Sequence, residues 1–242
     1  MHWGVLGVAL LFAVGPFVTS FAGFNVEDFP NPSVEQTIQP PGWAFSIWGL
    51  IYTWLLVCAV AGATVRRHAA HWSAHRFPLV IALGIGAIWL PISGASPVAA
   101  TVLIWIMLLS AVSALVRTPV RDRWLLRVPV ALFAGWLTAA SAVSLGIVGP
   151  GYSFVFSQPV WTILAVAFAI FVAACVHLSL GRLPEYGLPI LWGFGAILIG
   201  SFGKDTLVTA LAALAVALIL ALMLWAPQIR RALAADERDD AY

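Results

Sequence analysis

Long apolar runs, separated by short polar stretches, make up almost the whole chain. Each of the eight runs is close to the roughly 20 residues that an α-helix needs to cross a bilayer. None alternates like the ~10-residue strands of a membrane β-barrel. The pattern therefore predicts an all-α fold, a polytopic membrane helix bundle with about eight transmembrane helices. The predicted spans are Trp3–Gly23, Trp43–Val65, Phe77–Ser93, Val98–Val116, Leu125–Val148, Val160–Leu180, Leu188–Phe202 and Thr206–Ala226.

Composition strengthens this prediction. Of the 242 residues, 62% are hydrophobic and 9% are charged, and the mean hydropathy is +0.99. A soluble domain has roughly 25% charged residues. A chain of this size cannot hide so much apolar surface in its interior, so its partner must be the lipid bilayer. We expect no nucleic-acid partner.

The charged residues are distributed unevenly among the loops. When eight spans alternate across the bilayer, every Lys and Arg except Lys204 falls on one side. By the positive-inside rule that side is cytoplasmic, and both termini lie there. We therefore predict a multi-pass protein of the bacterial inner (cytoplasmic) membrane. The cationic residues on the predicted inner side are Arg66, Arg67, Arg76, Arg117, Arg121, Arg123, Arg127, Arg182, Arg230, Arg231 and Arg238.

Residues 1–228 are expected to form a single transmembrane domain, and residues 229–242 a short cytoplasmic tail. Within this tail, the mixed charges of Asp236–Asp240 predict disorder. The first span resembles a signal peptide at its end, but no Lys or Arg precedes it and it is long. We interpret it as a retained helix, broken or kinked near Gly15-Pro16.

The densest group of special residues follows the longest loop on the predicted outer side. Pro40 and Pro41 interrupt regular structure, and aromatic residues then recur at helical spacing at Trp43, Phe45, Trp48 and Tyr52. The preceding loop, Phe24–Pro41, has two interpretations. It is either a lid over a cavity or a packed connector.

Six tryptophans fall deep within the predicted spans, where each indole N–H needs a hydrogen-bond partner. Serine and threonine side chains such as Ser93, Thr138 and Ser141 are candidates. As a set, these indoles either line a pocket for a flat apolar ligand, such as a tetrapyrrole or a sterol, or fill space between helices. The sequence leaves both open. The deep tryptophans are Trp48, Trp54, Trp89, Trp105, Trp136 and Trp192.

Groups for acid–base or metal chemistry are scarce. No Asp or Glu lies inside a predicted span, which argues against an ion-coupled transporter. No catalytic motif is found, so we do not expect an enzyme. His177, near the inner interface, is a weak candidate for an axial metal ligand or a proton relay, and a plain structural hydrogen bond is the favoured interpretation. His71 and His75 are interpreted as part of a basic loop rather than a metal site.

Three motifs carry a family resemblance. The run from Pro40 to Tyr52 resembles the Pro-Pro-x-Trp-x-Phe motif and the following aromatics of the TspO/MBR family, the tryptophan-rich sensory or translocator proteins. Phe45–Tyr52 reads Phe-Ser-Ile-Trp-Gly-Leu-Ile-Tyr, which is typical of a longer bacterial branch of TspO-related proteins. Gly135–Ala140 and Trp89 resemble later motifs of the family.

The resemblance covers mainly residues 40–145, and the additional helices lie outside it. It implies a helix-lined pocket that binds porphyrins, haem or other apolar ligands beneath the first outer loop. Gly86 and Ser144 stand where the family pattern has asparagine, so the chain lacks two amides that the family uses as polar contacts.

The function that the resemblance implies is therefore a TspO-like protein with a sensory or carrier role. Its cofactor or ligand is a porphyrin or haem, or another planar apolar molecule. The alternative is an accessory or structural subunit that docks onto a larger membrane complex, and a homodimer is also open. The expected ligand-binding residues are Pro40, Pro41, Trp43, Phe45, Trp48, Tyr52, Trp89 and Trp136.

Overall fold

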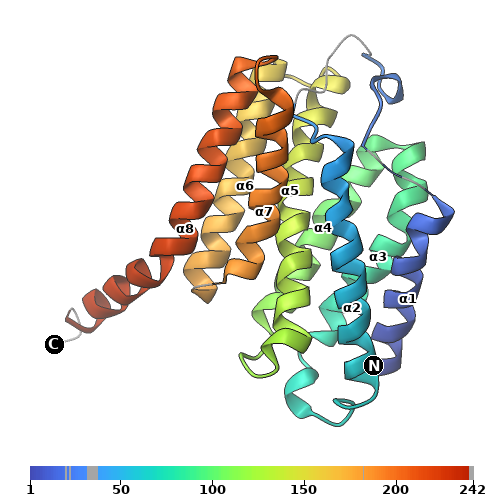
Figure 1. Ribbon diagram of the computed structural model, residues 1–242, viewed down its shortest axis with the longest axis vertical. Helices are drawn as coiled ribbons and strands as arrows, with labels where there is room; N and C mark the ends of the chain where they lie inside the picture. Colours follow the sequence, from blue (N-terminus) through green and yellow to red (C-terminus); the bar gives the residue numbers. More distant parts are fainter. Residues whose placement is uncertain (20, 22, 32–37, 182, 240–242) are drawn as a thin grey trace.

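The computed structural model describes residues 1–19, 21, 23–31, 38–181 and 183–239, and helices dominate it (Figure 1). The described residues contain no strand, which confirms the all-α prediction. Eight α-helices follow one another in the predicted order. They are α1 (His2–Val18), α2 (Ile47–Ala63), α3 (Arg76–Ala95), α4 (Pro97–Val116), α5 (Val128–Gly151), α6 (Gln158–Leu180), α7 (Pro184–Ser201) and α8 (Thr206–Asp239).

The helices run alternately up and down in one bundle, with α5 at its centre (Figure 1). α5 packs against α4, α6 and α7, and most of its residues are buried. α1 packs against α2 and α3 on one side of the bundle, and α8 packs against α6 and α7 on the other. The core therefore follows α5, while the outer helices expose apolar side chains such as Phe17, Leu109 and Phe171. Such an apolar exterior suits a lipid environment.

Six helical segments are long and apolar enough to cross a membrane by length and composition. α1 is a shorter apolar helix, and α7 completes the bundle between α5 and α8. The chain is thus a multi-pass helical membrane protein. α3 has 20 residues and is longer than the predicted third span, because it begins at Arg76 and continues through Pro91 to Ala95.

Helix ends are set by local sequence. The Ser96 hydroxyl accepts a hydrogen bond from the Ala99 amide, and Pro97 follows at the first position of α4, so α3 and α4 join in a tight turn. Asp205 caps α8 in the same way, since its Oδ1 accepts from the Val208 amide at 3.0 Å.

Of two local predictions, one holds at most in part and the other was wrong. α1 is not broken at Gly15-Pro16, because the helix passes through Pro16 and ends at Val18, so only the predicted kink is left open. The tail expected to be disordered is helical, since α8 continues to Asp239 and extends away from the bundle (Figure 1). Alanine, arginine and leucine are strong helix formers, and they dominate the chain just beyond the bundle.

α5 and α7 approach so closely at one point that only glycine fits. A Cβ atom built on Gly135 would lie 2.0 Å from the carbonyl oxygen of Tyr186. The Tyr186 hydroxyl reaches back to α5 and lies 2.8 Å from Thr138 Oγ1 in the buried core. Close backbone approach with a polar side-chain bridge is a common way to join membrane helices.

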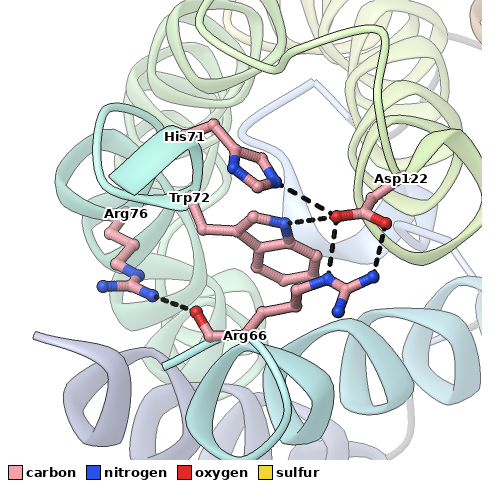
Figure 2. Close-up of polar contacts among 5 residues, drawn as sticks. All are labelled: Arg66, His71, Trp72, Arg76 and Asp122. Carbon is pink, nitrogen blue, oxygen red and sulfur yellow. Dashed lines mark hydrogen bonds and ion pairs between the residues drawn. The ribbon is translucent and has the colours of Figure 1, made fainter. Parts of the chain in front are cut away.

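The described arginines of the loops lie at the end of the bundle where α1 begins, which we call the arginine-rich end. Here Asp122 gathers three partners (Figure 2). Its carboxylate accepts two hydrogen bonds from Arg66 and one from Trp72, and it lies 3.2 Å from His71 Nε2. Arg76 adds a bond to the Arg66 carbonyl. Arg66 above all, then His71 and Trp72, hold the pKa of Asp122 well below its usual range.

The two residues after Asp122 reach other helices. Arg123 pairs with Glu185 at the start of α7. The Trp124 carbonyl accepts the indole N–H of Trp54 at 2.8 Å, and the two indoles stack with their centroids 6.1 Å apart. Residues 122–124 thus join α2, the loop after α2, and α7 to the short π-helical turn that precedes α5. Glu185, which lies just before the predicted seventh span, is 7% exposed in the first turn of α7.

Candidate functional site

A cavity of about 180 Å³ lies within the bundle, away from the arginine-rich end. α1 to α5 form most of its wall, Gly193 of α7 completes it, and the loop after α1 covers it. Aromatic side chains dominate the wall, and none of the described lining residues is Asp, Glu, Lys, Arg or His. The aromatic lining residues are Phe12, Phe21, Phe24, Phe45, Trp48, Tyr52, Trp89 and Trp136.

The beginning of α2 supplies one face of the cavity. Trp48 and Tyr52 are four residues apart, one turn along the helix, and their rings stack 5.2 Å apart with planes 16° from parallel. Trp136 of α5 meets Trp48 edge to face at 6.1 Å. Phe45 meets Trp136 in the same manner, also at 6.1 Å. The helical spacing of the aromatics thus brings them together as predicted.

α1 closes the floor of the cavity through Phe12. The Phe12 ring contacts Tyr52 at 4.8 Å, Trp48 at 5.8 Å and Phe133 at 5.6 Å, measured between centroids. Gly86 of α3 makes room for it, because a Cβ atom there would lie 2.6 Å from the Phe12 ring. The glycine at the position where the family pattern has asparagine therefore admits an aromatic ring from α1.

The loop after α1 is held across the cavity by a pair of hydrogen bonds. The Phe24 amide donates to Gln39 Oε1 at 2.8 Å, and Gln39 Nε2 donates to the Phe24 carbonyl at 3.0 Å. Gly23 sits beside this pair with a φ of +114°, and a side chain there would collide with Gln39. We call the Phe24–Gln39 pair the latch. It ties the two ends of the loop together.

Further ring contacts seat the described part of the loop on the bundle. Phe21 packs edge to face against Trp89 of α3 at 5.0 Å. Phe29 is buried, and its ring fills the space that a side chain at Gly151 would need. The described residues of this segment therefore pack on the bundle and in part line the cavity, which agrees with both the lid and the packed-connector interpretations.

Six of the eight expected ligand-binding residues line the cavity: Pro40, Phe45, Trp48, Tyr52, Trp89 and Trp136. Pro41 and Trp43 do not. Pro41 packs against Gly200 of α7, where a Cβ atom would lie 2.9 Å from its ring. Trp43 is 49% exposed and meets Trp192 of α7 edge to face at 5.4 Å. These two residues hold the start of α2 against α7.

The tryptophans predicted to lie deep in the spans donate to main-chain carbonyls in several cases, rather than to the Ser and Thr side chains that we expected. Trp89 Nε1 donates to the Ala100 carbonyl at 2.8 Å, and Trp192 Nε1 donates to the Ala44 carbonyl at 2.8 Å. Trp105 donates to the carbonyl of Ser141 at 3.2 Å. Trp136 Nε1 is buried and has no partner in the described part of the chain.

His177 lies outside the cavity. It is fully buried between α6 and α7, with its ring 5.6 Å from the ring of Tyr186. Within the described residues, no group of three His, Cys, Asp or Glu side chains is arranged to hold a metal ion. His71 serves the Asp122 cluster instead, which agrees with its interpretation as part of a basic loop.

Sequence reasoning missed several lining residues that come from outside the aromatic motif. Phe12, Phe21, Phe24 and Gln39 all precede it, and Met107 lies on α4. The lid interpretation of the first outer loop, Phe24–Pro41, included Phe24 and Gln39 but did not name them as lining residues. No pattern in the sequence marked Phe12, because every position of its helix neighbourhood is apolar.

These features define a class of protein: a multi-pass helical membrane protein with an aromatic cavity beneath a latched loop. The comparison with protein families agrees with this class. The family described as TSPO-like protein matches residues 3–225, and the chain therefore belongs to the TSPO-like family. The match extends well beyond residues 40–145, on which the sequence resemblance rested. Neither the curated proteins nor the solved structures contain a significant match.

Proposed function

We propose that this TSPO-like protein binds a planar apolar molecule in its aromatic cavity. One observation carries the proposal: eight aromatic side chains surround a cavity whose described lining has no charged group. Ring faces and edges favour a flat, apolar partner, and each aromatic contact contributes beyond its buried area. Ligand sites are commonly apolar cavities with few polar groups.

The family resemblance suggests a tetrapyrrole as the ligand. The cavity of about 180 Å³ is smaller than the ~300–1,000 Å³ of most ligand sites, so a whole macrocycle requires it to widen. The cavity would widen at the latched loop, because the latch consists of only two hydrogen bonds, which a small movement of the loop would break. None of the described lining residues is a histidine that could act as an axial ligand to a haem iron. Binding of a porphyrin or haem would therefore rest on ring contacts.

The proposed role is sensory or carrier binding without chemical conversion of the ligand. The loops support a bacterial inner-membrane location, since the arginines of the described loops gather at one end of the bundle, as the positive-inside rule requires of a cytoplasmic face. If this end is cytoplasmic, a protease should cleave its loops in sealed inverted vesicles. The same loops should be protected in right-side-out vesicles.

The binding proposal is tested by filling the cavity. Ala140 lines it and is small, so Ala140→Phe places a ring where the ligand would lie. Quenching of tryptophan fluorescence by protoporphyrin is expected to saturate in the wild-type protein, purified as the full chain in lipid nanodiscs. The filled variant is expected to lose at least tenfold in affinity.

The matched control is Ala217→Phe, which adds the same ring to an exposed position on α8, remote from the cavity lining. It should bind as the wild type does. Equal protoporphyrin affinity in the wild type and Ala140→Phe would show that this cavity is not the binding site.

A further inference from the structure

Among the described lining residues of the cavity the polar groups are all uncharged, and the most deeply buried hydroxyl belongs to Ser144. We propose that the cavity selects uncharged molecules that insert one or two fused rings and present one hydrogen-bonding group to Ser144. This inference rests on the proposed function, because it names the chemical class that the same cavity accepts.

The volume of the cavity limits the size of the molecules that it accepts. Its volume of about 180 Å³ is close to that of the ~150 Å³ engineered cavity that binds benzene. One or two fused rings therefore match the space as it stands. A larger molecule places only its ring portion there, with the remainder directed between the helices or past the latched loop.

The charge of a ligand limits its binding further. A carboxylate in an apolar site is strongly disfavoured unless a cation or several donors pair with it. No Lys, Arg or His is among the described residues that line the cavity. The clustered arginines lie at the other end of the bundle, where Asp122 and Glu185 already pair with Arg66 and Arg123. An anionic group inside the cavity would have no counter-charge among these residues, so the propionates of protoporphyrin would have to stay outside it.

Most polar groups of the lining are already engaged. Both ends of the Gln39 amide bond to the main chain of Phe24, and the Trp89 N–H bonds to the Ala100 carbonyl. Trp48 and Tyr52 contribute an indole N–H and a phenol, but both side chains are only half-buried.

Two lining groups differ from these. Trp136 Nε1 is buried and has no partner in the described part of the chain. Ser144 lines the cavity from α5, it is 4% exposed, and its hydroxyl makes no hydrogen bond with any described residue. A helical hydroxyl often bonds to the carbonyl four residues earlier. Thr138 on the same helix does so, with 2.9 Å from Oγ1 to the Ala134 carbonyl. Ser144 therefore retains a free donor at the cavity wall.

Three probes with one ring system separate these requirements. 2-Acetylnaphthalene is neutral and carries an acceptor, 2-isopropylnaphthalene has the same shape without one, and 2-naphthoate is an anion. Binding to the full chain in nanodiscs is measured by calorimetry, with empty nanodiscs as the background. We expect 2-acetylnaphthalene to bind best and 2-naphthoate at least tenfold more weakly.

The Ser144→Ala variant should weaken 2-acetylnaphthalene about three- to tenfold, as expected for one hydrogen bond, and leave 2-isopropylnaphthalene unchanged. The matched control is Ser141→Ala, one turn earlier on α5, whose hydroxyl faces the Ile104 carbonyl and does not line the cavity. It should leave the affinities of all three probes unchanged and so shows that effects at Ser144 do not come from altered folding.

The inference is overturned if 2-naphthoate binds as well as 2-acetylnaphthalene, if Ser144→Ala weakens both neutral probes alike, or if 2-acetylnaphthalene does not bind. In each of these cases, saturable binding of 2-isopropylnaphthalene that Ala140→Phe removes still supports the proposed function. Failure of every probe, together with equal protoporphyrin quenching in Ala140→Phe, counts against the proposed function as well.

Discussion

Arg66 and Asp122 form a two-point ion pair between two loops that are 56 residues apart in the sequence. Arg66 Nε lies 2.9 Å from Oδ2 of Asp122, and Arg66 Nη2 lies 2.8 Å from Oδ1. The planar guanidinium fits both carboxylate oxygens, which gives geometric precision as well as attraction. The pair fixes the loop after α2 against the turn that begins α5, the central helix.

Replacing this carboxylate by an amide is expected to destabilise the fold. Asp122→Asn keeps the side-chain shape and tolerates the backbone φ of 56°, so it removes mainly the charge. The apparent melting temperature of the purified protein should fall by several degrees at pH 7. The same measurement on Glu27→Gln, an exposed residue of the first loop, provides the control and should show little change.

The effect of Asp122→Asn should depend on pH. Because Arg66, His71 and Trp72 depress the pKa of Asp122 below the ~3.9 of an unfolded chain, the carboxylate stabilises the fold fully above about pH 4. That contribution is lost as the pH falls from there towards the folded pKa. The melting temperatures of wild type and variant should therefore differ at pH 7 and converge on acidification below pH 4. A difference that stays constant down to the lowest accessible pH would argue against the depressed pKa.

Gly135→Ala tests the crossing of α5 and α7. The new methyl group would meet the Tyr186 carbonyl at 2.0 Å, and backbone atoms cannot move aside cheaply. We expect a loss of roughly 1–3 kcal/mol or more in stability, in line with overpacking of a tight core. Thermal unfolding measures it. Gly195→Ala on α7 has open space around its Cβ position and should be neutral or slightly stabilising. Equal behaviour of the two variants would contradict the close crossing.

Gln39→Met tests the latch. Methionine keeps the length of the side chain but removes both hydrogen bonds to the Phe24 main chain. Hydrogen exchange followed by mass spectrometry should show faster exchange at the Phe24 amide and its neighbours, with α5 unaffected. The Glu27→Gln variant in the same loop serves as the comparison. Unchanged exchange around Phe24 would mean that ring packing, rather than the latch, holds the loop.

Phe12→Ala should change the size preference of the cavity. The ring fills the space between Gly86 and the stacked pair Trp48–Tyr52, so its removal enlarges the cavity. We expect lower thermal stability from lost packing and a higher affinity for protoporphyrin relative to two-ring probes. Phe17→Ala, at a position that is 90% exposed on the same helix, should alter neither property. A fall in protoporphyrin affinity with Phe12→Ala would show that the ring is itself a required contact.

The sequence was sufficient for the helices and for part of the cavity. Apolar runs of membrane-spanning length predicted all eight helices in order, because bilayer thickness constrains them so strongly. Helical spacing grouped Phe45, Trp48 and Tyr52, and the family resemblance implied that they line a cavity. Trp43 belongs to the same motif but faces α7, since a compact motif covers more than one side of its helix.

Other features depend on contacts between distant segments and have no local signature. Phe12 reaches the cavity only because α1 packs across α2 and α3. The Gln39 latch requires the two ends of the loop to meet. Glu185 escaped notice because it begins α7, just outside the apolar run, and its partner Arg123 lies 62 residues away.

The contacts of α7 have a consequence for biosynthesis. The cavity gains Gly193 from α7, and Trp192 bonds to the Ala44 carbonyl, 148 residues earlier in the chain. During translation, the aromatic residues of α2 enter the membrane long before the helix that secures them is made. Until α7 is inserted, the cavity formed by the first five helices is incomplete and Arg123 lacks its partner Glu185. A nascent chain released before α7 would present an incomplete cavity to the lipid, and quality-control proteases would be expected to recognise it.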